Sequence, residues 1–185
     1  MAGRALRDHI EAAILDAAAT VLADRGPAVS MAEIAAAAGV ARATLYRYFP
    51  NREALLEGLL AAASSDLLAR IDDAELDTVA VPEALARLTR GFLTAGGKYA
   101  ALMQPGGKTD KDAELDAQLS EPVRRLLARG VDEGALRSDL PVDLLFDMYT
   151  GLLEKALYAI LRRTTGLEQA GAAVLTIFLD GARPA

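Results

Sequence analysis

Cysteine and tryptophan are absent from this chain of 185 residues, histidine occurs once, and aromatic residues make up only 5% of it. Without cysteine there are no disulfides and no thiolate chemistry, which agrees with the cytoplasmic location that we expect. No uncharged apolar run approaches the roughly 18 residues of a membrane helix, so we expect no contact with a membrane. The first residues mix basic and acidic side chains, so no signal peptide is expected.

Groups suited to catalysis are also scarce. The single histidine, His9, lies near the N-terminus, and no nucleophile–base pair, paired carboxylates or metal-ligand cluster is visible. The acidic run at 72–77 lacks the glycine and the spacing of a calcium loop, and Gly-Lys-Thr at 107–109 lacks the first glycine of a Walker motif. We therefore predict no catalytic residue, no metal and no cofactor, and a protein that is not an enzyme.

The formal net charge of −6 is divided unevenly along the chain. Residues 1–52 contain six arginines and five acidic residues, a net charge of +1, which leaves −7 for the remainder. Because the local field matters more than the total, the first 52 residues are the better candidate for contact with nucleic acid. A surplus of one positive charge predicts modest nonspecific affinity that depends strongly on salt.

Apolar residues recur at intervals of three or four through most of the sequence, which is typical of amphipathic helices. We predict an all-α fold of about nine helices. The expected long helices span residues 4–25, 51–71, 82–103, 112–130, 141–164 and 167–180, with two short helices between 30 and 48 and a helical turn after 130.

Residues 30–60 contain the most informative pattern. Ser30 and Glu33 have the spacing of a capping box, and Gly39 ends the first short helix where a left-handed residue is needed. Pro50 ends the second short helix, because it disfavours helical angles in the residue before it. Two short helices around a glycine predict a helix-turn-helix, whose second helix enters the DNA major groove.

The second short helix has two different faces. Leu45 and Phe49 fall on one side and are predicted to be buried, whereas Arg47 points the opposite way, flanked by Thr44 and Tyr46. Arginine can pair with guanine through two hydrogen bonds, and hydroxyls can donate to phosphates. The polar face therefore suits contact with DNA.

The run Gly-Val-Ala-Arg-Ala-Thr-Leu-Tyr-Arg-Tyr-Phe-Pro-Asn-Arg-Glu-Ala-Leu-Leu at 39–56 resembles the signature of tetracycline-repressor-type (TetR) transcriptional regulators. The motif covers roughly residues 25–60, and residues 75–185 resemble the family in architecture only. The resemblance implies that tyrosines grip phosphates, that arginines of the second helix read sequence, and that the arginine starting the next helix contacts phosphate. The implied DNA-binding residues are Ser30, Arg42, Ala43, Thr44, Tyr46, Arg47, Tyr48 and Arg52.

Structural alternatives stay open for several of these residues. Tyr46 and Tyr48 could pack halfway into the core, Ser30 could act mainly as a helix cap, and Arg52 could be a solvated residue at a helix start. Arg4 and Arg7 could form a basic arm that touches DNA, although we favour a frayed, solvated terminus.

The expected division is a helix-turn-helix DNA-binding domain at 1–52 and a ligand-binding and dimerisation domain at 53–185. Helices at 141–164 and 167–180 are apolar nearly all round, so they should be buried on two sides. The resemblance implies a homodimer through these two helices, and a purely intramolecular core is the alternative. Glycines at 91, 96 and 97 could permit a bend or make room for a ligand, or they could allow close helix packing.

Large side chains on the expected core helices give the candidate ligand-binding residues, which are Phe92, Tyr99, Met103, Phe146 and Tyr149. The many aliphatic residues suggest an apolar small-molecule effector. The resemblance implies a transcriptional regulator, most often a repressor, that binds a near-palindromic double-stranded DNA operator as a dimer and is released by the effector. The alternative is a helical ligand-binding or protein-interaction module that has lost DNA binding.

Overall fold

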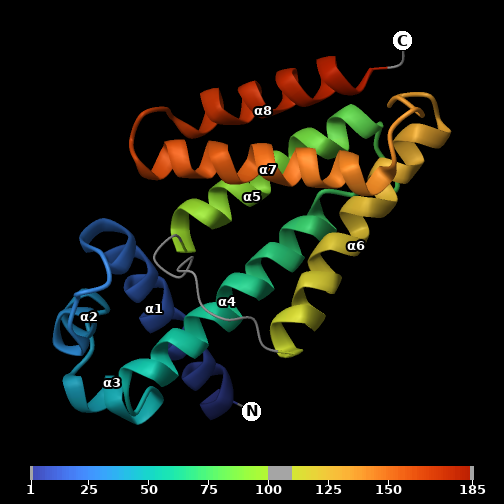
Figure 1. The fold of residues 1–185 in the computed structure, drawn as a ribbon. Coiled ribbons are helices and arrows are strands. Elements are labelled where there is room, and N and C mark those ends of the chain that lie inside the picture. The colour runs from blue at the N-terminus through green and yellow to red at the C-terminus, as the bar shows by residue number, and fades with distance from the viewer. Residues whose placement is uncertain (1, 100–109, 184–185) are drawn as a thin grey trace. The chain divides into compact units, whose positions relative to one another are not determined.

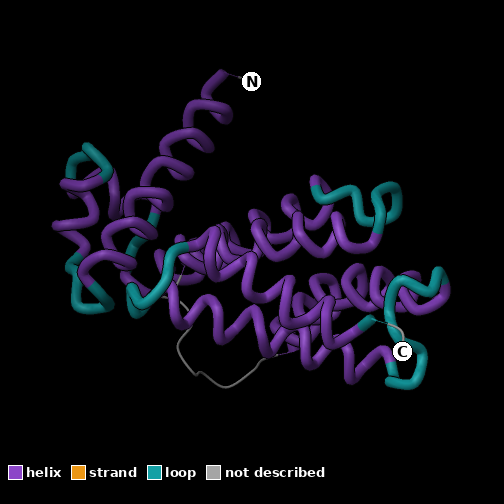
Figure 2. The backbone as a smooth tube through the Cα atoms, turned by 90° about the horizontal axis from the view of Figure 1, so that it is seen from above, coloured by secondary structure: helices purple, strands orange, loops and turns teal. Residues whose placement is uncertain are grey.

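The computed structural model describes residues 2–99 and 110–183, and its described elements are all helices (Figure 1). Neither view shows a strand in these ranges (Figure 2), so the predicted all-α class is confirmed. Residues 2–99 and 110–183 form eight helices, close to the nine or so predicted, and the segment after α6 makes only turns. They are α1 (Ala2–Arg25), α2 (Met31–Ala37), α3 (Arg42–Tyr48), α4 (Arg52–Asp73), α5 (Val81–Tyr99), α6 (Asp110–Asp132), α7 (Val142–Leu161) and α8 (Leu167–Ala182).

The chain forms two compact units. The described part of the first unit covers residues 2–65 and 98–99, and that of the second covers 66–97 and 110–183. Both α4 and α5 therefore contribute residues to each unit. None of the described helices is long and apolar enough to cross a membrane.

The first unit is built on a core shared by its short and long helices. Helices of seven residues, such as α2 and α3, are too short to be stable in isolation, so they depend on burial of their apolar side. Ile34 of α2 and Leu45 of α3 are fully buried, and they share a core with Ile14, Leu55 and other apolar side chains of α1 and α4. This burial fixes which side of α3 faces outward.

The second unit buries apolar side chains of α5, α6, α7 and α8 in one main cluster. Helix α6 packs on α7, and α7 lies beside α8, to which it is joined by a short turn (Figure 1). At the centre, the Tyr149 ring lies 5.1 Å from the Phe178 ring, and its hydroxyl donates to the Leu85 carbonyl and shares a 2.9 Å hydrogen bond with Thr89. Burial raises the pKa of Tyr149, and the Thr89 bond lowers it only in part, so the phenol stays protonated.

The glycines of α5 serve close packing in at least one position. A Cβ atom on Gly96 would lie 2.6 Å from Cδ2 of Leu157, a residue that is 2% exposed. Gly96 therefore lets α5 and α7 approach, as the packing alternative predicted. A Cβ on Gly97 would meet no atom within 4 Å.

This difference predicts the outcome of a matched pair of substitutions. Gly96→Ala should be less stable than Gly97→Ala by about 1–3 kcal/mol, because only the first forces a methyl group into packed atoms. The gain in helix propensity is shared by both variants and cancels in the comparison. Urea unfolding of the two proteins measures the difference, and equal stability would contradict the packing role of Gly96.

Candidate DNA-binding surface and ligand cavity

The helix-turn-helix begins at the predicted capping box. The backbone N–H of Glu33 donates to the Ser30 hydroxyl at 3.3 Å, and the Ser30 backbone N–H donates to the Glu33 carboxylate at 2.9 Å. These bonds from Ser30 hold the pKa of Glu33 below its usual value. The Ser30 hydroxyl also donates to this carboxylate, at 2.7 Å, so the cap is the role that its contacts define. A phosphate contact by Ser30 stays a prediction.

The turn between α2 and α3 depends on Gly39, whose φ of +67° lies in the left-handed region that favours glycine. After this turn, α3 buries Leu45 and the following Phe49, as predicted. Thr44 and Tyr48 are half-buried. The exposed residues of α3 are Arg42, Ala43, Tyr46 and Arg47.

The ring of Tyr48 lies near two arginines. The guanidinium carbon of Arg47 is 5.5 Å from the centre of its ring, and that of Arg7 in α1 is 5.9 Å from it. Both distances fall within the range of cation–π contact. The helix α1 begins at Ala2, so Arg7 lies within this helix, and its side chain is exposed. Arg7 of α1 and Arg47 of α3 therefore lie near the same tyrosine ring, a proximity that the sequence alone did not indicate.

Arg52 holds the loop between α1 and α2. One Nη of its guanidinium donates to the Val29 carbonyl and the other donates to the Pro27 carbonyl. Asn51 caps α4 beside it, since its side chain accepts from the Ala54 N–H at 2.8 Å. The structure therefore gives Arg52 a positioning role in the unit. For the predicted phosphate contact, the same guanidinium would have to bind a phosphate in addition to the two carbonyl groups.

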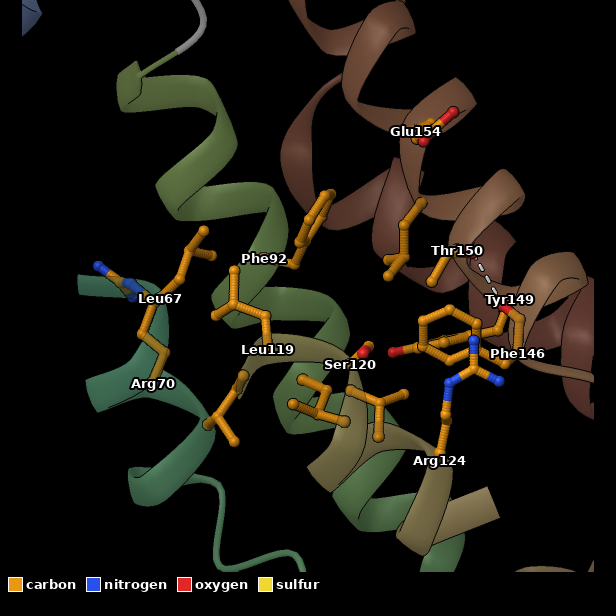
Figure 3. A pocket seen from close by; sticks show the side chains of 14 residues that line it. Leu67, Arg70, Phe92, Leu119, Ser120, Arg124, Phe146, Tyr149, Thr150 and Glu154 are labelled. Atoms are coloured by element: carbon orange, nitrogen blue, oxygen red, sulfur yellow. Dashed lines mark hydrogen bonds between the residues drawn. The ribbon is translucent and has the colours of Figure 1, made fainter. Parts of the chain in front are cut away.

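The second unit contains a cavity of about 460 Å³ between α4, α5, α6 and α7, a volume typical of small-molecule sites (Figure 3). Its wall is mostly apolar. The apolar lining residues are Leu67, Ile71, Leu88, Phe92, Leu119, Val123, Phe146, Tyr149 and Leu153, and the polar ones are Arg70, Ser120, Arg124, Thr150 and Glu154.

The predicted ligand residues divide into three groups. Phe92, Phe146 and Tyr149 line this cavity. Tyr99 does not: it packs against the core of the first unit, because the last turn of α5 belongs to that unit. Lys98 holds this turn, with Nζ 2.7 Å from the Asp16 carboxylate. Met103 lies outside the described residues.

The polar lining residues were missed from the sequence, because a charged side chain on an amphipathic helix ordinarily faces water. In the described ranges, no group of three or more His, Cys, Asp and Glu side chains could hold a metal ion. The chain thus contains a helix-turn-helix unit, whose α3 exposes a polar face, and a helical unit with a partly open, mostly apolar cavity. The first is the arrangement of a DNA-binding regulator.

Comparison with known sequences supports this class. The family model "Bacterial regulatory proteins, tetR family" matches residues 14–59. The HTH-type transcriptional repressor KstR2 of Rhodococcus jostii (strain RHA1) is 31% identical over 144 residues, which cover 72% of this chain and 71% of that protein. The HTH-type transcriptional repressor LfrR of Mycolicibacterium smegmatis is 41% identical over 90 residues, covering 49% and 47% of the two chains.

Solved structures agree. LfrR from Mycobacterium smegmatis in complex with proflavine is similar with a TM-score of 0.76 and 29% identity, over 95% of this chain and 97% of that one. The fatty acid degradation regulator FadR from Bacillus halodurans is similar with a TM-score of 0.72 and 26% identity, over 92% and 98% of the two chains. The chain belongs to the TetR family of bacterial transcriptional regulators. It is therefore a regulator and not an enzyme.

The contacts of Arg52 predict a loss of stability when they are removed. Arg52→Gln should lower the free energy of unfolding by about 1.5–3 kcal/mol, because hydrogen bonds from a charged donor to two carbonyls are lost. Arg42→Gln is the matched control: Arg42 is exposed, has no hydrogen bond among the described residues, and should change stability by less than about 0.5 kcal/mol. Urea unfolding measures both, and an unchanged Arg52→Gln protein would exclude the positioning role.

Proposed function

We propose that the protein is a homodimeric repressor that binds a near-palindromic operator through α3 and is released when a small molecule occupies the cavity of the second unit. The observation that supports this most directly is the division of α3. Its apolar side chains are buried in the first unit, and Arg42, Ala43, Tyr46 and Arg47 are exposed together on the helix. A short helix that is anchored by its buried side can insert its exposed side into a major groove of DNA.

In this proposal the exposed groups divide the work of recognition. Arg42 and Arg47 read base edges, since a guanidinium can donate two hydrogen bonds to guanine. Tyr46, Tyr48 and Thr44 donate hydroxyl hydrogen bonds to phosphates, which fix the register of the helix. Ala43 permits close approach to the groove. Arg7, near the Tyr48 ring, adds a positive charge on the same group of residues.

Dimerisation is proposed through α7 and α8, because these helices expose large apolar side chains. Met148 and Tyr158 of α7 are 55% and 58% exposed, and Ile177 of α8 is 60% exposed. Leu144 and Leu161 add to the same set on α7. Apolar side chains gathered on two neighbouring helices mark an interaction surface. A second copy would cover them and place two α3 helices about 34–36 Å apart, as successive major grooves require.

The effector is proposed to act through helices that the two units share. The α4 residues Leu67 and Arg70 and the α5 residue Phe92 line the cavity, and both helices continue into the first unit. A ligand that binds one arrangement more tightly shifts the dimers toward it, by no more than its difference in affinity. The proflavine complex of the relative LfrR shows that a small molecule binds that protein, which supports the same use of this fold.

In vitro selection of random duplex DNA with the purified protein tests the DNA-binding proposal. The expected result is an enriched inverted repeat. Arg47→Ala should weaken binding to that repeat by about 1–3 kcal/mol and relax the preference at one base pair of each half-site. Arg163→Ala, which removes the same charge from the second unit, should leave affinity nearly unchanged. No enrichment at low salt would instead favour a helical ligand-binding module that has lost DNA binding.

The dimer proposal predicts the effect of a charge on the α7–α8 surface. Ile177→Glu should convert the dimer to a monomer, because a buried carboxylate without a partner opposes association. Leu60→Glu changes a residue of α4 that is 51% exposed and should leave the mass unchanged. Sedimentation measures both, and a dimer that persists in Ile177→Glu would place the interface elsewhere.

A further inference from the structure

The polar groups of the cavity in the second unit narrow the chemistry of its ligand. Two hydroxyls are already committed: Tyr149 bonds to Leu85 and Thr89, and Thr150 donates to the Phe146 carbonyl at 2.8 Å. The Ser120 hydroxyl has only a long contact of 3.4 Å, to the Ala117 carbonyl. Recognition of a polar ligand group therefore falls to the charged side chains and Ser120.

The three charged lining residues differ in their surroundings. Arg70 is engaged on its own helix, with Nε 3.2 Å from the Asp66 carboxylate, and its stem lies against Gly91. Glu154 is exposed, so water screens its charge. Arg124 has the same side-chain exposure as Arg70, 33%, but the carboxylate paired with Arg70 is itself only 27% exposed. The guanidinium of Arg124 also lies 4.0 Å from the centre of the Phe146 ring (Figure 3).

Arg124 also keeps donors available. Its Nη1 pairs with Asp143, a carboxylate that is 83% exposed, and Nε and Nη2 have no hydrogen-bond partner among the described residues. Those two nitrogens form one edge of the guanidinium, which matches the two oxygens of a carboxylate. A cation that is partly removed from water attracts an anion more strongly than one that is fully hydrated.

We infer that the ligand of this cavity is an amphipathic carboxylate, whose anionic group pairs with Arg124 beside Ser120 and whose apolar body lies against Phe92, Leu119 and Leu67. The inference rests on the proposed use of the cavity as the effector site. It replaces the purely apolar effector expected from composition with one that has a single charged end. Asp143 then competes with the ligand carboxylate, since its own carboxylate pairs with the same arginine.

The test uses three probes with the same apolar chain: decanoate, decanol and decylamine. Calorimetric titration of the full-length protein should give tightest binding for decanoate and weakest for decylamine. Arg124→Gln should weaken decanoate binding roughly tenfold to a hundredfold and leave decanol unchanged, because a charged hydrogen-bond pair is lost. Arg125→Gln is the matched control: Arg125 is the next residue of α6, is exposed and does not line the cavity, so the order and the decanoate affinity should stay unchanged.

Asp143→Asn provides a second readout that does not depend on the folding of the Arg124 variant. Removing the competing carboxylate should tighten decanoate binding, whereas a purely structural Arg124–Asp143 pair would give no gain. Equal affinity for the three probes, tighter binding of decylamine that is lost in Glu154→Gln, or no binding at all would each overturn the inference. Decanoate binding that depends on Arg124 but does not release operator DNA would retain the ligand class and reject effector release.

Discussion

The burial of Leu45 and Phe49 is the constraint on which the function of the first unit depends. A helix of seven residues has too few internal hydrogen bonds to persist alone, so α3 exists only while these side chains stay in the shared core. Because the buried side is fixed, the opposite side is fixed too. The exposure of Arg47 and Tyr46 is therefore a consequence of core packing in the first unit. The residues that fold α3 into this unit also present its polar side for contact with DNA.

Local signals in the sequence were sufficient for most of this unit. The capping box at Ser30, the left-handed turn at Gly39 and the stop at Pro50 each act within a few residues, so they can be recognised without the fold. The contacts of Arg52 and Arg7 could not be predicted in this way. Both join segments that are distant in the sequence, namely α4 with the loop at 27–29 and α1 with Tyr48.

The ligand cavity was predictable only in part. Phe92, Phe146 and Tyr149 were found because large side chains on core helices tend to line any space between those helices. Helical periodicity cannot tell which compact unit the end of a long helix joins, and for this reason the sequence did not separate Tyr99, which packs in the first unit, from the residues that line the cavity. Arg124 was not predicted, because its position in the sequence of α6 is typical of a solvated side chain. The chemistry of the proposed ligand is thus inferred from residues that only tertiary packing identifies.

The most direct test of the account is a guanine-methylation interference map of the selected operator, because methylation of guanine N7 blocks the major-groove edge that arginine reads. A dimer that inserts two α3 helices predicts interference in two patches centred one helical turn apart, about 10 base pairs, and none at the guanines between them. Arg47→Ala should remove the interference at one guanine in each patch. Interference in a single patch, or no interference at any guanine N7 of the operator, would contradict a dimer that inserts two α3 helices.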